Sequence, residues 1–408
     1  MFAWQTPLST AWQDSLTAST RMHVVGIDRL VLTGATGFIG GTVLVTLMNA
    51  GLIERLVCLV RAATAQQALT RLRASAIRCG LPYVRAQRLT EANVIVGDLG
   101  GDFTEADLVR LTEASHVINC AAMASFSMNS QVLDINVRDT LRFASHFADS
   151  NVLRRFLHVS TAMACGTQCS PVVPESAFGF GENESGNEDG NESGNESETN
   201  HLVPYTQSKR DVERLLRLYY PSLPLVVVRP SIVVGHTVLG TLPSPSIFWV
   251  FRVVHAARRF SAKAMTRLDV VSVDDCARAL ALLAVKPKLA FDTYHVSAGS
   301  EAPTIGQIIG AMDEATGISG KRYSICAPRD FRRIACDVVG RQHRAAARLI
   351  EHALGIYAGF ANLDYQFDNR RLRDEIGFEP LPFIDYVGEC VRTSRGVGIV
   401  EQMRWDFK

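Results

Sequence analysis

The 408-residue sequence has almost no net charge, no long apolar run and no regular cysteine pattern. Lys and Arg total 42 against 41 for Asp and Glu, so the net charge of +1 gives no reason to expect nucleic acid or an anionic membrane as partner. No stretch reaches the roughly 18 consecutive apolar residues of a membrane span, and the first residues do not resemble a secretory signal. These absences predict a cytoplasmic protein without a transmembrane segment.

The nine cysteines form no Cys-x-x-Cys pair, and most lie inside apolar runs. We therefore expect reduced core thiols rather than a disulfide framework. The ten histidines are scattered without metal-ligand spacing, so the sequence predicts no metal site.

A short acidic segment departs from the even charge balance. Residues 186–197 repeat a four-residue unit that begins Gly-Asn-Glu, and no basic residue lies between 181 and 200. Gly, Asn, Ser and Glu without apolar anchors cannot offset the entropy cost of ordering. We predict a disordered loop at about 180–200 and favour an expanded surface loop over an acidic lid or docking element.

Between residues 29 and 229 short apolar strands alternate with helical stretches. The expected strands are 30–33, 55–60, 93–97, 116–119, 155–159 and 225–229, and the expected helices are 38–50, 65–79, 105–113, 131–148 and 205–220. This order predicts an α/β fold with a Rossmann-type, doubly wound parallel sheet. The alternation becomes irregular afterwards, as expected of an appended substrate-binding lobe. The chain therefore divides into an N-terminal extension (1–28), a Rossmann domain (29–235) and a smaller C-terminal lobe (236–408).

A glycine-rich segment joins the first expected strand to the first expected helix. Thr33 to Gly40 reads Thr-Gly-Ala-Thr-Gly-Phe-Ile-Gly. Glycines at this junction permit a tight turn, close approach of a pyrophosphate to the helix N-terminus, and close packing of helix on strand. We expect this segment to bind a dinucleotide through Gly34, Thr36, Gly37, Phe38, Ile39 and Gly40.

Residues at the ends of the next strands indicate which dinucleotide binds and which side chains contact it. The second strand is followed by Arg61 instead of the acid that would bind an adenosine ribose hydroxyl, so NADP(H) is favoured over NAD(H). Asp98, followed by Leu99, ends the third strand, where it can accept a hydrogen bond from the adenine amino group. Ala121 follows the fourth strand and leaves room for a cofactor.

Tyr205 and Lys209 are the sharpest chemical signal. Spaced four residues apart at the start of a helix, they share one face, so the ammonium can lower the phenol pKa and Lys209 can hold the nicotinamide ribose. Ser160 and Thr161 end the fifth strand, and strand alternation would point one hydroxyl at the cofactor. We select Thr161.

The chain resembles the extended short-chain dehydrogenase/reductases from Leu30 to about Phe383. It is most similar to the thioester reductases, which include fatty acyl-CoA reductases and the terminal reductase domains of carboxylic acid reductases and nonribosomal peptide synthetases. The matching segments include 33–40, 58–62, 96–99, 158–161, 205–216, 228–231 and 271–275. The resemblance implies a Thr161, Tyr205 and Lys209 triad and NADP(H) binding by Gly34, Gly37, Gly40 and Arg61.

This resemblance implies an NADPH-dependent reductase of an acyl-CoA or a carrier-protein thioester, giving an aldehyde and possibly an alcohol. The sequence departs from the family at the acidic repeat and at Val203-Pro204, which replaces a glycine-aromatic pair; both bear on acyl specificity. Segment 247–263, aromatic and basic, could accept an acyl chain and a pantetheine phosphate, or could simply pack the second lobe onto the sheet.

Two other functions stay open. The chain could be an extended reductase acting on a ketone, an aldehyde, a hydroxysteroid-like compound or a nucleotide sugar, although Arg61 argues against the last. It could also be a cofactor-sensing regulatory protein, although such proteins typically lose the Tyr and Lys that are present here. The sequence leaves the acyl group, the final product and the oligomeric state undetermined.

Overall fold

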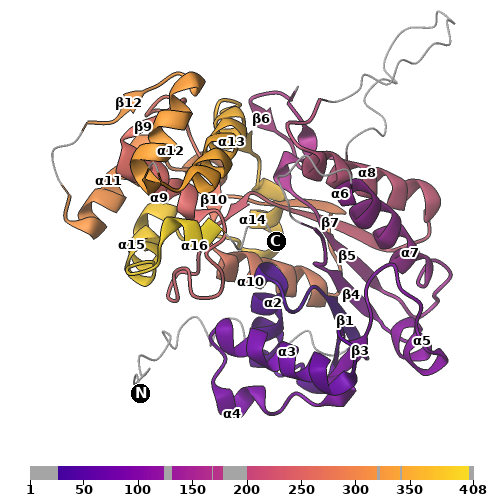
Figure 1. Cartoon of the computed structure of the whole chain (residues 1–408). Helices are drawn as coiled ribbons and strands as arrows, with labels where there is room; N and C mark the ends of the chain where they lie inside the picture. Colours follow the sequence, from indigo (N-terminus) through magenta and orange to yellow (C-terminus); the bar gives the residue numbers. More distant parts are fainter. Residues whose placement is uncertain are drawn as a thin grey trace, which may run out of the picture.

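The computed structural model describes residues 26–123, 131–167, 169–177, 200–318, 322–340 and 342–403. At its centre is a seven-stranded parallel sheet with the order β11-β7-β5-β4-β1-β2-β3 and helices on both faces (Figure 1). The predicted Rossmann-type, doubly wound α/β fold with a smaller C-terminal lobe is confirmed.

The six predicted strands are present, with ends that shift by at most one residue: β1 (Leu30–Thr33), β2 (Leu56–Val60), β3 (Val94–Val96), β4 (His116–Asn119), β5 (Arg155–Val159) and β7 (Leu225–Pro230). The sequence did not predict a seventh strand, β11 (Thr293–Val296), which pairs with β7 and forms one edge of the sheet. Three pairs of two-residue strands lie outside the sheet: β8 (Ile232–Val233) with β10 (Val270–Val271), β9 (Arg259–Phe260) with β12 (Ser324–Ile325), and β6 (Val172–Val173) with β13 (Gln366–Phe367).

Most predicted helices of the first domain are also present: α2 (Phe38–Asn49), α3 (Ala65–Arg78), α5 (Glu105–Thr112) and α8 (Pro204–Tyr219), with the short α4 (Tyr83–Ala86) following α3. The prediction of one continuous α-helix over 131–148 is wrong, because a π-helical turn interrupts the segment. The segment consists of α6 (Gln131–Leu133), a π-helical turn (Asp134–Asp139) and α7 (Thr140–Ser145). Hydrophobic periodicity does not distinguish a π-turn from an α-turn over six residues.

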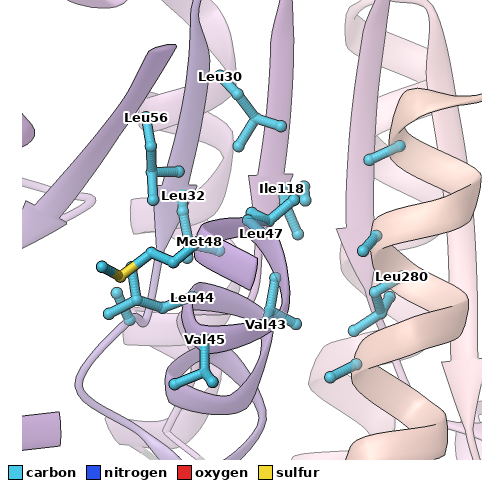
Figure 2. Packing of buried hydrophobic residues seen from close by; sticks show 14 of the residues in the cluster. Leu30, Leu32, Val43, Leu44, Val45, Leu47, Met48, Leu56, Ile118 and Leu280 are labelled. Atoms are coloured by element: carbon cyan, nitrogen blue, oxygen red, sulfur yellow. The ribbon is translucent and has the colours of Figure 1, made fainter. Parts of the chain in front are cut away.

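Alternation along the strands supplies two buried layers. Leu30 and Leu32 of β1 pack toward α2 and α10 (Val273–Val285), while Val31 joins the opposite layer with Phe143 of α7 and Val212 of α8. Figure 2 shows α2 lying against the sheet residues Leu30, Leu32, Leu56 and Ile118, with Leu280 of α10 nearby. All nine cysteines are free thiols.

The C-terminal lobe is mainly helical: α9 (Phe248–Ala257), α11 (Ile305–Thr316), α12 (Phe331–Val339), α13 (Arg344–Ala361), α15 (Phe383–Thr393) and α16 (Ile399–Met403) (Figure 1). Its own core includes Trp249, Phe331 and Ile350. Two elements after residue 235 belong to the sheet domain: β11 is a strand of the sheet, and α10 packs against α2 and the sheet. The helix α14 (Arg370–Ile376) packs against β11. The boundary at 235 remains a proposal, while the N-terminal extension and the acidic loop lie almost wholly outside the described residues.

Candidate functional site

The glycine loop after β1 is tightly packed against its surroundings. Gly34 has φ +71°, and a Cβ there would lie 2.8 Å from the backbone nitrogen of Ala121. A Cβ on Gly40 would lie 2.2 Å from the carbonyl oxygen of Gly34. Since no other residue fits these two positions without a backbone shift, the structure explains both glycines sterically. The loop leads directly into α2, whose N-cap, Gly37, has no side chain to occupy the helix N-terminus.

The other residues expected to bind the cofactor lie in this loop, at the start of α2 and after the neighbouring strands β2 and β3. Thr36, Phe38 and Ile39 are half-buried. Arg61 and Asp98 are exposed, immediately beyond β2 and just after β3 respectively. Leu99 differs, because it is only 8% exposed and packs in the core layer with α5 and α7. The Leu99 side chain is therefore part of the hydrophobic core.

Ser160 and Thr161 follow β5 and have different surroundings. The Ser160 hydroxyl donates a short hydrogen bond to the carboxylate of Glu213, in the interior. Thr161 is half-buried and caps a 3-10 helix (Ala162–Cys165), where its hydroxyl oxygen accepts from the Met163 N–H at 3.3 Å. This contact leaves the hydroxyl proton of Thr161 able to donate. The structure thus separates the two hydroxyls as strand alternation predicts.

Tyr205 and Lys209 lie one turn apart in the first half of α8, which begins with Pro204. Lys209 is 3% exposed, and its Nζ donates to the carbonyl oxygen of Val159 at 2.7 Å. Because Val159 is the last residue of β5, this bond ties the lysine to the strand end that carries Thr161. The structure therefore brings α8 and the end of β5 together.

Burial shifts the pKa of both groups on α8. It raises the pKa of Tyr205 to about 12 and lowers the pKa of Lys209 to about 8. The expected net lowering of the Tyr205 pKa toward neutral pH is therefore wrong. Desolvation of the phenolate dominates, and the lysine ammonium is directed at the Val159 carbonyl.

Asn136 is a buried polar residue of this region that sequence reasoning missed. It lies in the π-helical turn, and its Nδ2 donates to the Ser208 hydroxyl at 3.0 Å and to the Met123 carbonyl at 3.2 Å. Its Oδ1 accepts from the Met123 N–H at 2.7 Å. The amide thereby joins α8 to the chain that follows β4. Only the π-turn points to it, since such turns frequently occur at functional sites.

Glu213 and Arg229 form a fully buried ion pair behind the strand ends. Their side chains are 3% and 0% exposed, and Arg229 donates through Nε and Nη2 to the Glu213 carboxylate, at 2.5 Å for the shortest contact. The same carboxylate accepts from Ser160. This network connects α8, β7 and the end of β5.

An apolar pocket opens in the C-terminal lobe. Phe251 of α9 and Ile309 of α11 line it, so the aromatic part of segment 247–263 reaches a cavity as well as packing the lobe. The basic part is less available for a phosphate. His255 Nε2 donates to the Asp313 carboxylate at 2.8 Å, and Arg258 donates to the same carboxylate.

Neither a cluster of metal ligands nor a membrane-spanning helix occurs in the parts of the chain that the structure describes. No three His, Cys, Asp or Glu side chains there come together in a way that could hold a metal ion. No helix there is long and apolar enough to cross a membrane.

A glycine loop on a Rossmann-type sheet, with a Tyr-Lys pair tied to the fifth strand, defines an oxidoreductase fold of the extended short-chain dehydrogenase/reductase class. The chain belongs to the family described as "Male sterility protein", whose model matches residues 32–280. This is a family of NAD(P)-binding domains, and thioester reductases are part of it.

Known relatives agree with this assignment. The chain is 28% identical over 226 residues to the nonribosomal peptide synthetase asaC of Aspergillus flavus. This match covers 52% of this chain and 20% of asaC. It is 27% identical over 289 residues to the non-canonical nonribosomal peptide synthetase FrzA of Cladobotryum sp.. This match covers 68% of this chain and 27% of FrzA. The chain thus spans about a fifth to a quarter of these relatives.

Solved structures show the same fold. The terminal R domain from the myxalamid PKS-NRPS biosynthetic pathway matches with a TM-score of 0.69 at 19% identity, covering 94% of this chain and 98% of that one. The likeness extends through the C-terminal lobe as well as the sheet.

Proposed function

We propose that the chain is an NADPH-dependent reductase of acyl thioesters, with Thr161, Tyr205 and Lys209 as its catalytic residues. The observation that carries this proposal is the bond from Lys209 Nζ to the Val159 carbonyl. It ties the helix turn that carries Tyr205 and Lys209 to the end of β5, two residues before Thr161. We expect the Tyr205 phenol and the Thr161 hydroxyl to donate to one substrate oxygen from these two elements.

The residues around the glycine loop fit a dinucleotide. Gly34 and Gly40 allow the loop to pack closely on itself and on the chain after β4, and the exposed Gly37 at the N-cap of α2 leaves the helix N-terminus free of side chains, where a pyrophosphate would bind. Arg61 is exposed at the end of the neighbouring strand, where a guanidinium suits a 2′-phosphate. The glycine loop fits either dinucleotide, and Arg61 favours NADP(H). The remaining contacts that we propose come from Thr36, Asp98 and Ala121.

The proposed reaction uses the protonated phenol of Tyr205 as the acid. NADPH supplies a hydride to the acyl carbon when bound. Thr161 and Tyr205 donate hydrogen bonds to the carbonyl oxygen as negative charge develops there, and Tyr205 then transfers its proton. Because burial raises the pKa of Tyr205 to about 12, the phenol is fully protonated at neutral pH and enters the reaction as an acid. Lys209 stabilises the phenolate that remains.

The immediate product of a thioester is a hemithioacetal, which collapses to a thiol and an aldehyde. A second reduction in the same site would give an alcohol. We propose a CoA thioester or a carrier-protein thioester as substrate, because the relatives asaC and FrzA are nonribosomal peptide synthetases.

Substitution of Tyr205 tests these roles. Tyr205→Phe removes the proton donor and should lower the turnover number by at least about 100-fold while NADPH affinity stays near that of the unmodified protein. Tyr219→Phe is the matched control, since Tyr219 lies at the exposed end of the same helix. Equal turnover of the two variants would refute the proposed acid.

A further inference from the structure

Two cysteines lie close together just after the candidate site. Cys165 is the last residue of the 3-10 helix that Thr161 caps, and Cys169 follows four positions later. Both are free thiols. The Cys169 thiol donates to the backbone carbonyl oxygen of Cys165 at 3.3 Å, and the Cys165 thiol donates to the Cys169 sulfur. The two sulfurs are therefore within hydrogen-bonding reach of each other.

The two thiols differ in their access to solvent. Cys165 is 1% exposed and packs in a small apolar cluster with Val173 of β6 and Phe367 of β13. Cys169 is half-buried at the edge of this cluster, and its backbone N–H donates to the Tyr365 hydroxyl at 3.2 Å. Cys169 is therefore the thiol that a reagent in solution reaches, whereas the fold shields Cys165.

Cys169 is also the thiol that ionises more readily. The hydrogen bond from the Cys165 thiol, helped by the positive charges of Arg210 and Arg229, lowers the pKa of Cys169 to about 7 although the side chain is partly buried. The same hydrogen bond, together with burial, raises the pKa of Cys165. Because the thiolate is the nucleophilic form of cysteine, the pair combines a nucleophile at position 169 with a protonated thiol at position 165.

We propose that Cys165 and Cys169 form a redox-sensitive dithiol, which hydrogen peroxide oxidises to an intramolecular disulfide beside the candidate site. The Cys169 thiolate attacks one peroxide oxygen. An S–O bond forms, the O–O bond breaks, and the leaving hydroxide takes a proton from solvent to become water. The Cys165 thiol then attacks the sulfenic sulfur of Cys169. An S–S bond forms, the S–O bond breaks, and the hydroxide leaves with the Cys165 proton as a second water.

The disulfide acts on the candidate site through the 3-10 helix. Bonded sulfurs lie about 2.05 Å apart, closer than two hydrogen-bonded thiols, so residues 165 and 169 must shift when the bond forms. Cys165 ends the helix whose first turn holds the Thr161 hydroxyl through the Met163 N–H. This effect rests on the function proposed above, in which Thr161 binds the substrate oxygen. Since a displacement of about 1 Å can cost about 100-fold in rate, we expect oxidation to lower turnover at least about tenfold.

Peptide mass spectrometry of the whole protein tests the disulfide itself. The reduced protein is treated with an equimolar amount of hydrogen peroxide, and the remaining thiols are alkylated before digestion. The expected product is a peptide that contains both Cys165 and Cys169, carries no alkyl group on either, and is about 2 Da lighter than its reduced form. Alkylation of both cysteines after oxidation would overturn the proposal. A sulfinic or sulfonic acid at Cys169 without a disulfide would overturn it as well.

A third cysteine supplies a matched control. Cys326 is also half-buried, but burial and the negative charge of Asp330 raise its pKa. At pH 7 iodoacetamide should alkylate Cys169 at least about fivefold faster than Cys326, because the larger thiolate fraction outweighs the lower nucleophilicity of a more acidic thiol. Cys169→Ala should abolish the effect of peroxide on turnover, and Cys326→Ala should leave it unchanged. Equal alkylation rates, or equal peroxide sensitivity of the two variants, would count against the proposal.

NADPH oxidation with a pantetheine thioester separates this proposal from the proposed function. Turnover is measured on the reduced protein, after peroxide, and after addition of dithiothreitol. A fall of at least about tenfold that dithiothreitol reverses, in the unmodified protein but not in Cys169→Ala, supports the proposal. A disulfide in the mass spectrum with unchanged turnover would refute its action on the site. If the reduced protein has no turnover, the proposed reductase function fails by itself, and the mass spectrum still decides whether the dithiol forms a disulfide.

Discussion

The buried carboxylate of Glu213 is the most sensitive point of the network behind the candidate site. It accepts from Arg229 Nε and Nη2 and from the Ser160 hydroxyl, and none of these groups reaches solvent. Glu213→Gln keeps the shape but removes the charge. Its new amide N–H₂ must then face a donor of Arg229 or Ser160, and Arg229 loses its counter-charge. Breaking a buried pair in this way costs about 3–5 kcal/mol of unfolding free energy.

Urea unfolding followed by circular dichroism measures this cost. Glu54→Gln is the control, because Glu54 pairs with Arg88 at 3.4 Å while both side chains are more than half exposed. An exposed pair contributes about 1 kcal/mol or less. A loss below about 1 kcal/mol for Glu213→Gln, equal to that of the control, would refute the view that this carboxylate holds α8, β5 and β7 together.

Three further predictions concern the cofactor loop, the cofactor itself and pH. Gly40→Ala places a Cβ against the Gly34 carbonyl and should cost about 1–3 kcal/mol and weaken NADPH binding measured by fluorescence, whereas Gly310→Ala, which meets open space on α11, should be neutral or stabilising. Arg61→Ala should raise the KM for NADPH about tenfold or more and leave the KM for NADH unchanged; equal changes would exclude a 2′-phosphate contact. Burial raises the pKa of Glu175 from 4.5 to about 7, so its contribution to stability is full below pH 4.5 and is lost as the pH rises to 7. Relative to the unmodified protein, Glu175→Gln should gain about 3 kcal/mol across this interval in urea unfolding, and parallel stability curves would contradict the buried carboxyl.

Local pattern predicted most of the sheet because its strands are short apolar runs separated by helix signals. The edge strand β11 escaped prediction. Its four residues, Thr293–Val296, alternate polar and apolar side chains, and only their long-range pairing with β7 identifies them as part of the sheet. The π-turn that carries Asn136 was missed for a related reason: its hydrogen bonds depend on contacts with α8 that no local spacing encodes.

The candidate site also has features that local sequence predicts and features that depend on the folded chain. Strand alternation predicted that Ser160 and Thr161 face different surroundings, and the Ser160–Glu213 bond agrees with it. The proton affinity of Tyr205 could not be predicted from its spacing with Lys209. It depends on how far the folded chain excludes water from the phenol, and burial raises the pKa where proximity to a cation alone would lower it.

The most direct test of the central claim is a stoichiometric assay of NADPH oxidation and thiol release with a pantetheine thioester of an apolar acyl group. Thioester reduction predicts one thiol released for each NADPH oxidised when the product is an aldehyde, or for every two when it is an alcohol. Oxidation of NADPH with ketones, aldehydes or nucleotide sugars and none with thioesters would contradict the account and assign the chain a different substrate within the same fold.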